Sequence, residues 1–214
     1  MPKLVIFDCD GVLVDSEPLT LRFLRDELAE SGLDLPLAEV EDRFVGGTLP
    51  GVADRARGMG ADLPEGWVDD FYARLYTRLA AGTDLIPGVV ALLDRLDAAG
   101  IGYGVGSNGR MAKMRVTLGQ HPAMWARLQG RIFSVEDVAR PKPAPDLYLH
   151  VARSLGAKFA DCVVVEDSAT GARAARAAGM RCFGYAPHGD GAKLTAEGAQ
   201  VFGSMDDLPA LLGL

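Results

Sequence analysis

Cysteine is scarce in this chain, and its scarcity excludes two classes of small protein. The 214 residues contain three cysteines, Cys9, Cys162 and Cys182, an odd number at widely separated positions. That distribution offers neither a disulfide framework nor the paired spacing of a zinc site. Each cysteine lies at or beside a predicted strand, so we interpret all three as small packing residues.

An excess of positive charge and long apolar runs are also missing. The chain has 22 basic and 29 acidic residues, a net charge of −7, which argues against general binding to nucleic acid or to a membrane surface. No apolar run approaches the length of a membrane span, and residues 1–3 lead into a strand without the layout of a signal peptide. We therefore expect a cytoplasmic protein whose partners are small molecules or cations.

What the sequence does contain is a long alternation of helix and strand. The predicted strands are residues 4–7, 101–105, 131–133, 162–165 and, as the last, 181–185. The predicted helices between and after them are residues 89–98, 110–118, 145–155 and 169–178. Such alternation predicts an α/β fold of three layers, a Rossmann-like parallel sheet with helices on both faces.

One long segment interrupts this alternation. Between residues 18 and 81 no strand is indicated, and apolar residues recur at helical spacing, as from Leu19 to Leu28 and from Trp67 to Leu79. We expect a bundle of about four helices, with residues 82–88 as the return linker. The predicted domains are a core of residues 1–15 and 84–214 and an inserted helical domain of residues 16–83.

The first strand ends in two carboxylates, Asp8 and Asp10, followed by Gly11. Residues i and i+2 of a strand point to the same side, so the two acids share one face if the extended conformation continues. A fold keeps such a pair when one acid is protonated or when a cation lies between them, and an oxygen-only cluster suits Mg²⁺. Gly11 permits a sharp turn whose N–H groups can face an anion. The alternative is an ordinary strand end with two solvated acids.

Polar residues follow the later strands as well, where ligands bind in open α/β sheets. Ser107 and Asn108 open a helix, and a hydroxyl beside a helix N-terminus suits a phosphate oxygen, but these two residues taken alone favour a simple N-cap. Lys142 has proline on both sides, so a stiff loop presents its ammonium. It could hold a phosphate, or be a solvated lysine at a helix start.

Glu166 and Asp167 follow the buried strand 162–165 and add a second pair of acids. Four acids at one sheet edge are prohibitive if they are buried without partners, and a bound divalent cation resolves the repulsion. In the alternative, Asp167 and Ser168 only cap the helix that begins there.

In combination, these strand ends resemble the four motifs of the haloacid dehalogenase superfamily. The matching residues, in order, are Asp8, Asp10, Gly11 and Asp15, then Ser107 and Asn108, then Lys142 between prolines, then Val165 to Ser168. The inserted helical segment is similar to the cap domain of the subfamily that includes β-phosphoglucomutase and many sugar-phosphate and phosphoglycolate phosphatases. The resemblance covers nearly the whole chain.

The resemblance implies a role for each matched residue. Asp8 would be the nucleophile that forms an aspartyl-phosphate, and Asp10 would protonate the leaving alkoxide and then activate water. Mg²⁺ would be held by Asp8, Asp10 and Asp167, with Glu166 at or beside the metal. The phosphoryl group would be held by Asp10, Gly11, Ser107, Asn108 and Lys142. Monomers are common in this family, so we expect a monomer.

The chemistry of these residues favours a Mg²⁺-dependent phosphatase of small phosphorylated metabolites. Covalent catalysis by Asp8 needs the phosphoryl charge neutralised, by Mg²⁺ and Lys142, and an acid for a poor leaving group, Asp10. True dehalogenases need no such acid, so Asp10 argues against halide chemistry. A non-catalytic binding module is the less favoured class because these residues are intact.

A β-phosphoglucomutase activity is the second interpretation. The mutase cap has a histidine where this chain has Thr20, and its phosphate-binding arginine is replaced here, since Gly46, Gly47 and Thr48 are followed by Leu49. The substrate is not identified by the sequence. The inserted segment carries several arginines that could meet a second anion, although most are expected on solvated helix faces: Arg22, Arg25, Arg43, Arg55, Arg57, Arg74 and Arg78.

Overall fold

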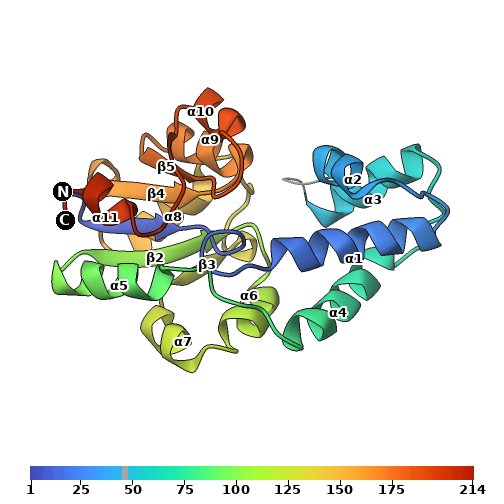
Figure 1. Cartoon of the computed structure of the whole chain (residues 1–214), viewed down its shortest axis with the longest axis horizontal. Coiled ribbons are helices and arrows are strands. Elements are labelled where there is room, and N and C mark those ends of the chain that lie inside the picture. Colours follow the sequence, from blue (N-terminus) through green and yellow to red (C-terminus); the bar gives the residue numbers. More distant parts are fainter. Residues whose placement is uncertain (45–47) are drawn as a thin grey trace. The chain divides into compact units, whose positions relative to one another are not determined.

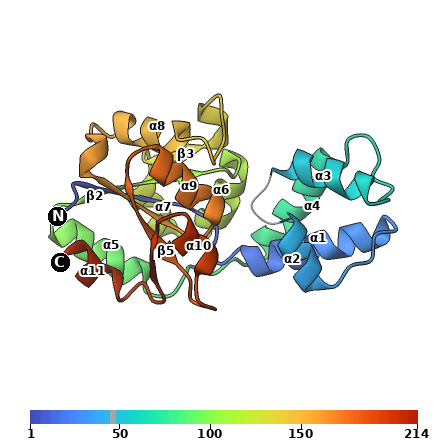
Figure 2. The same ribbon diagram turned by 90° about the horizontal axis from the view of Figure 1, so that it is seen from above.

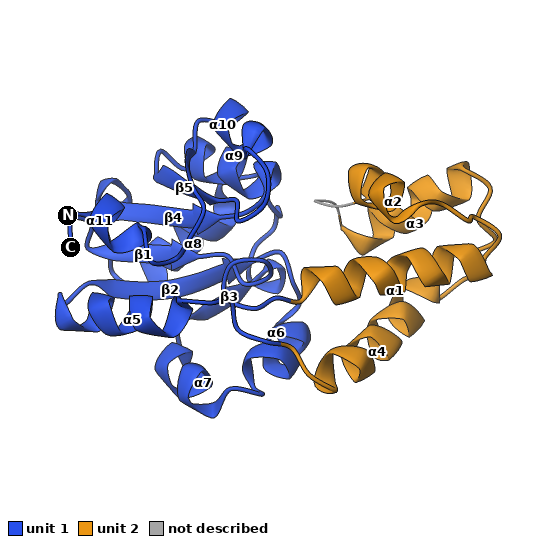
Figure 3. Ribbon diagram, viewed as in Figure 1, with its two compact units in different colours: residues 1–15, 84–214 blue, residues 16–83 orange. Residues whose placement is uncertain are grey.

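The computed structural model describes residues 1–44 and 48–214 and divides into two compact units (Figure 3). The larger unit is Met1–Asp15 with Asp84–Leu214, and the smaller unit is Ser16–Thr83. All the strands of the sheet belong to the larger unit, and the described elements of the smaller unit are helices. Each unit has its own apolar core.

The larger unit is built on a six-stranded parallel sheet in the order β3-β2-β1-β4-β5-β6 (Figure 1). The strands are β1 (Leu4–Phe7), β2 (Gly102–Ser107), β3 (Ile132–Ser134), β4 (Cys162–Glu166), β5 (Arg181–Tyr185) and β6 (Gln200–Phe202). The helices are α5 (Val89–Ala98), α6 (Met111–Leu118), α7 (Pro122–Leu128), α8 (Asp146–Ser154), α9 (Ala169–Ala177), α10 (Ala192–Ala196) and α11 (Leu208–Leu212). The predicted α/β class is confirmed.

The expectation that residues 181–185 form the last strand is wrong. A sixth strand, β6, pairs with β5 in parallel, with Phe183 opposite Gln200 and Tyr185 opposite Phe202. Only three residues long, β6 shows no measurable alternation in the sequence, and its place is defined by pairing with a distant strand. Helices α7, α10 and α11 were likewise not predicted.

The two faces of the sheet are covered by different helices, as Figures 1 and 2 show. Successive residues of a strand point to opposite faces. Val5 and Phe7 of β1 accordingly join a cluster with side chains of α5 and α11, whereas Leu4 and Ile6 join a second cluster with α8 and α9. Because both faces are buried, β1 is a continuous apolar run, as is typical of a parallel sheet.

The strand register brings the predicted motif residues to one edge. Phe7 lies opposite Val105 of β2 and Val165 of β4, so all three strands reach their carboxyl ends at the same level. The residues that continue these strands are Asp8 after β1 and Glu166, which ends β4. Parallel strand pairing alone therefore brings Asp8 and Glu166 together at this edge.

Glycines in β2 bring α8 close to the sheet. A Cβ at Gly106 would be 3.0 Å from Val151 Cγ2, and one at Gly104 would be 2.5 Å from Leu155 Cδ1, so neither position accommodates a side chain without movement. Because α8 begins directly after the loop that carries Lys142, this close packing also fixes where that loop lies.

The smaller unit is a helical bundle of α1 (Glu17–Glu30), α2 (Leu37–Phe44), α3 (Leu49–Gly58) and α4 (Trp67–Ala80). An aromatic cluster forms its centre. The rings of Phe23 and Trp67 lie 4.9 and 5.0 Å from that of Phe71. Beside this cluster, Arg74 of α4 donates to both carboxylate oxygens of Glu27 of α1, which joins the two longest helices.

The chain passes between the units twice, and the two segments at these points form hydrogen bonds with each other within the larger unit. The Asp15 N–H donates to the Asp84 carbonyl at 2.8 Å, and the Ile86 N–H donates to the Leu13 carbonyl at 3.0 Å. The segment expected as a linker, residues 82–88, is therefore partly a short antiparallel pairing with residues 13–15. In the part of the chain described, no helix has the length and apolar content to cross a membrane.

Candidate active site

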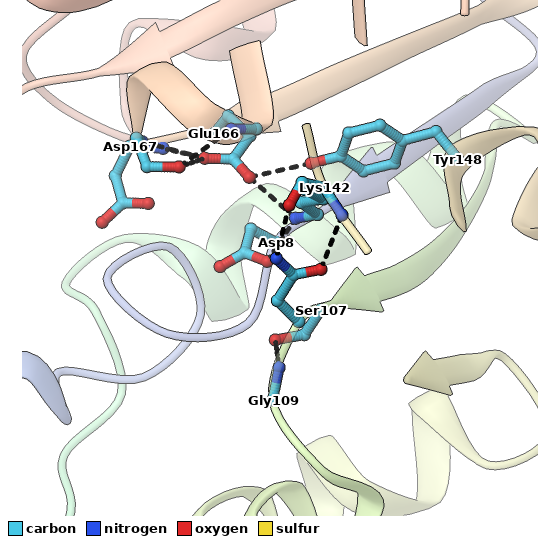
Figure 4. A network of polar contacts seen from close by, with 10 residues as sticks. Asp8, Ser107, Gly109, Lys142, Tyr148, Glu166 and Asp167 are labelled. Atoms are coloured by element: carbon cyan, nitrogen blue, oxygen red, sulfur yellow. Dashed lines mark hydrogen bonds and ion pairs between the residues drawn. The ribbon is translucent and has the colours of Figure 1, made fainter. Parts of the chain in front are cut away.

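A buried lysine connects two carboxylates at the sheet edge (Figure 4). The Lys142 Nζ is 2.7 Å from Asp8 Oδ1 and 2.7 Å from Glu166 Oε1, and it lies 4.6 Å from the centre of the Tyr148 ring. Lys142, Asp8 and Glu166 are 6%, 8% and 1% exposed. The predicted residues from β1, β4 and the proline-flanked loop therefore form one network.

The electrostatics of the network differ between its two acids. Burial raises the pKa of Asp8 to about 7 against the opposing effect of Lys142, and the charges of Glu166 and Asp10 raise it further. For Glu166, burial also opposes ionisation, but Lys142 and hydrogen bonds from Ser168 and Tyr148 lower its pKa below the usual value. The two carboxylates thus differ in their charge near neutral pH. Glu166 is ionised and serves as the counter-ion of Lys142, whereas the raised pKa of Asp8 brings its ionisation into the neutral range.

Burial alone would lower the pKa of Lys142, but the carboxylates of Asp8 and Glu166 raise it above its usual value. The lysine is consequently a permanent cation at neutral pH. A fixed positive charge of this kind, screened from solvent, suits the binding of a phosphoryl group.

Glu166 has both carboxylate oxygens occupied. Oε1 accepts from Lys142 and from the Tyr148 hydroxyl at 2.9 Å. Oε2 accepts from the backbone N–H groups of Asp167 and Ser168, at 3.0 and 2.8 Å, and from the Ser168 hydroxyl at 2.9 Å. These five hydrogen bonds leave no oxygen lone pair for direct contact with a cation. The geometry favours Glu166 as the anchor of Lys142, beside a metal site and not in it.

Ser168 and Gly171 hold Glu166 in place from α9. The Ser168 Oγ donates to Glu166 and also accepts from the Gly171 N–H at 3.0 Å, as an N-cap does. A Cβ at Gly171 would be 1.6 Å from Glu166 Oε1, so only glycine leaves space for this carboxylate. Ser168 therefore caps α9, as the alternative interpretation held, and it also donates to the Glu166 carboxylate.

The side chain of Asn108 contacts the lysine loop. Its Oδ1 accepts from the Lys142 N–H at 3.0 Å, and its Nδ2 donates to the Lys142 carbonyl at 3.2 Å. The sequence suggested Asn108 as a phosphate ligand, but the observed side chain fixes the backbone that carries Lys142. Ser107, the last residue of β2, is 2% exposed, and its Oγ accepts from the Gly109 N–H at 3.0 Å.

Gly11 makes the predicted sharp turn, but its N–H forms a hydrogen bond within that turn. Its φ is +73°, in the left-handed region that favours glycine. The Gly11 N–H donates to the Val14 carbonyl at 2.9 Å, so this donor closes the loop and does not face an anion in this structure.

Asp10 is paired with a residue that the sequence analysis did not identify as part of the site. The Lys113 Nζ on α6 is 2.8 Å from Asp10 Oδ1, and the two side chains are 13% and 17% exposed. Lys113 occurs six positions after Ser107 and belongs to no motif. Only the packing of α6 against the loop after β1 reveals it.

The acids at this edge fit a magnesium ion, which the family resemblance implies. The donors are oxygen atoms only, and the raised pKa of Asp8 is the response expected of a buried carboxylate close to other acids. Among residues 1–44 and 48–214, no group of three histidine, cysteine or acidic side chains forms a ready-made metal cage. Mg²⁺ does not require one, since it is commonly held by one or two carboxylates with water and substrate phosphate completing its shell.

Comparison with known proteins gives matches over most of the chain. A family model described as haloacid dehalogenase-like hydrolase matches residues 2–179. The chain is 31% identical over 209 residues to the 6-phosphogluconate phosphatase of Escherichia coli (strain K12), covering 97% of this chain and 93% of that protein.

Two solved structures resemble the whole chain. A haloacid dehalogenase-like protein of unknown function from Agrobacterium tumefaciens has a TM-score of 0.87 and 32% identity, covering 100% of this chain and 98% of its own. A family hydrolase from Deinococcus radiodurans R1, solved with bound phosphate and sodium, has a TM-score of 0.79 and 33% identity, covering 99% and 95%.

The contact between Gly171 and Glu166 predicts a large effect of one methyl group. Gly171→Ala should displace the Glu166 carboxylate and leave Lys142 with one partner, lowering the free energy of unfolding by about 3 kcal/mol, the scale of breaking a buried ion pair. Urea unfolding measures this difference.

Gly58→Ala in α3 is the matched control. A Cβ there meets nothing within 4 Å, so the variant should be stabilised by about 0.5 kcal/mol through helix propensity. Equal stability of the two variants would contradict the assigned position of Glu166.

Proposed function

Because the chain belongs to the haloacid dehalogenase-like hydrolases, we propose that it is a phosphatase that hydrolyses a small phosphorylated metabolite through an aspartyl-phosphate on Asp8. The observation that carries the proposal is the buried Lys142, which pairs with Asp8 at 2.7 Å at the carboxyl edge of the sheet. A carboxylate, a fixed cation and a second carboxylate, Asp10, are the groups that covalent phosphoryl transfer needs.

In the first half of the reaction, a carboxylate oxygen of Asp8 attacks the phosphorus, and the bond from phosphorus to the ester oxygen breaks. Asp10 gives its proton to the leaving oxygen, so the product is an alcohol. Lys142 contacts Asp8 Oδ1, which directs the other oxygen of that carboxylate to the phosphorus. The lysine is also a permanent cation beside Asp8, able to neutralise charge on the transferring group.

In the second half, water attacks the phosphorus of the aspartyl-phosphate, and Asp10 takes the proton that the water loses. Inorganic phosphate leaves and Asp8 is restored as a carboxylate. The buried hydroxyl of Ser107 is the proposed donor to a phosphoryl oxygen in both halves. Asn108 and Glu166 act through Lys142, whose backbone and ammonium they hold.

Mg²⁺ is the proposed cofactor, and Asp8, Asp167 and the backbone carbonyl of Asp10 are the proposed protein ligands. When bound, the ion would neutralise charge on the phosphoryl oxygens and allow two anions to approach each other. Glu166 is left out of this set because donors occupy both of its oxygens.

The proposed substrate class is a sugar phosphate or sugar-acid phosphate. The support is the 6-phosphogluconate phosphatase that the chain matches over 97% of its length. Six of the arginines in the helical insert contact groups within their own unit: Arg25, Arg43, Arg55, Arg57, Arg74 and Arg78. Arg22 of α1, also in the insert, is exposed.

The mutase alternative is not favoured by the insert. The Thr20 hydroxyl donates to the Ser16 carbonyl at 2.8 Å and has no ionisable group for proton transfer. Thr48 caps α3 by accepting from the Gly51 N–H, and Leu49 begins that helix. The glycine pair Gly46–Gly47, where a mutase would continue to its arginine, lies outside the described residues.

Asp8→Asn tests the nucleophile. Turnover should fall on the order of 10³-fold or more because the attacking oxygen is lost. The protein should still fold and unfold cooperatively, because asparagine is nearly isosteric with aspartate and its amide oxygen can still accept from Lys142. The measurements are phosphate release and thermal unfolding without added metal. Asp62→Asn, an exposed acid of the insert, is the control and should change neither. Near wild-type turnover in Asp8→Asn would refute the mechanism.

The metal has a readout separate from activity. For a dissociation constant on the order of 1 mM, 10 mM Mg²⁺ should stabilise the fold by about 1.4 kcal/mol and raise the melting temperature by about 3–6 °C. Asp167→Asn should reduce this shift, whereas Asp62→Asn should retain it. EDTA should abolish turnover. If differential scanning calorimetry shows no Mg²⁺-dependent shift in the wild type, the proposed ion is wrong.

A third assay separates phosphatase from mutase. With no mutase-type histidine at position 20, the aspartyl-phosphate should be hydrolysed and not transferred to a second position of the sugar. We expect inorganic phosphate from a monophosphate ester and no conversion of β-glucose 1-phosphate to glucose 6-phosphate, even when a bisphosphate primes the reaction. Rapid formation of glucose 6-phosphate with little free phosphate would establish the alternative.

A further inference from the structure

The ion pair between Lys113 and Asp10 lies in the larger unit and has no role in the reaction as described so far. The Lys113 Nζ is 2.8 Å from Asp10 Oδ1, and both side chains are largely buried, at 13% and 17% exposure. An exposed ion pair contributes little because solvent screens it, but this one is mostly enclosed. It therefore restricts the orientation of the Asp10 carboxylate.

The backbone of α6 is itself fixed at the point where it meets Asp10. The N–H of Met111, the first residue of α6, donates to Glu136 Oε2 at 2.9 Å, so an acid that follows β3 holds the end of the helix. One residue before the helix cap, Gly109 approaches the site closely. A Cβ there would be 3.3 Å from Asp10 Oδ2, 3.2 Å from the Ser107 Oγ and 3.8 Å from Lys113 Cδ.

These contacts distinguish the two oxygens of Asp10. Oδ1 is held by Lys113, and Oδ2 lies on the side of Ser107, the proposed phosphoryl donor. Without the lysine, Oδ1 would lose this ion pair and the carboxylate would be less restricted in its orientation. Proton transfer needs the heavy atoms at hydrogen-bond distance, and a misplacement of about 1 Å can cost about 10²-fold in rate.

We propose that Lys113 is a positioning residue, which holds Asp10 Oδ1 so that Oδ2 faces the ester oxygen of the substrate. This inference rests on the proposed phosphatase function and adds a residue to it. Lys113 acts through Asp10, so its contribution exists only where Asp10 transfers a proton. If Lys113 instead bound the phosphoryl group directly, its contribution would be independent of Asp10.

A double-mutant cycle measures this difference. The variants are Lys113→Met, Asp10→Asn and the double variant, assayed with an alkyl ester, 6-phosphogluconate, and with p-nitrophenyl phosphate, whose leaving group needs no proton. For the alkyl ester, Lys113→Met should lower kcat by about 10- to 100-fold with KM changed by less than about twofold. For the aryl ester, the first half of the reaction needs no proton from Asp10, so the single-turnover rate of p-nitrophenol release should fall by under about threefold. In the Asp10→Asn background, Lys113→Met should cost less than about twofold for either ester.

Two further variants exclude a structural effect. Lys113→Arg keeps the cation and should restore most of the alkyl-ester turnover. Arg115→Met removes an exposed cation from the same helix and should behave as the wild type with both esters. Equal losses for the two esters, a raised KM, or full additivity with Asp10→Asn would overturn the proposal. Such a result would leave the phosphatase function intact, because the wild type and Asp8→Asn test that function separately.

Discussion

The ammonium of Lys142 is the interaction on which the rest of the site depends. It is the shared partner of Asp8 and Glu166, at 2.7 Å from each, in a place where solvent does not compensate for lost charge. Remove it, and two carboxylates from adjacent strands face each other at the end of a buried sheet. The surrounding contacts maintain this one position: Asn108 holds the lysine's backbone, Tyr148 and Ser168 hold Glu166, and Gly171 leaves the space that Glu166 occupies.

The arrangement follows from parallel strand pairing more than from local sequence. Phe7, Val105 and Val165 lie in register, so the residues that continue β1, β2 and β4 meet at the same height although they are far apart in the sequence. The sheet buries its apolar residues on both faces and leaves only its edge for polar groups. The same forces that stabilise the core therefore concentrate charge where a ligand can reach it.

Much of this could be predicted, and the exceptions have a common physical cause. The fold class and the clustering of Asp8, Lys142 and Glu166 follow from helix–strand alternation and the rule that strand ends converge. The hydrogen-bond or ion-pair partner of each side chain does not follow from the sequence pattern. Asn108, Gly11 and Glu166 looked like ligands by type and position, yet their polar groups bond to the protein itself. Lys113 and β6 were missed because each is defined by a contact with a distant segment, of which the local pattern carries no trace.

The charges gathered at the edge explain why the proposed reaction needs a divalent cation. Four negative charges gather here when all the acids are ionised: Asp8, Asp10, Glu166 and Asp167. The positive charges of Lys142 and Lys113 neutralise two of them, which leaves an excess of two negative charges. A phosphate dianion entering that site would be repelled, and the lysines cannot be redirected to it without freeing the acids they hold. A single dication cancels the excess while both lysines keep their positions. In the proposed reaction, the ion therefore makes the acid-rich site compatible with a phosphate dianion while Asp8 stays available as the nucleophile.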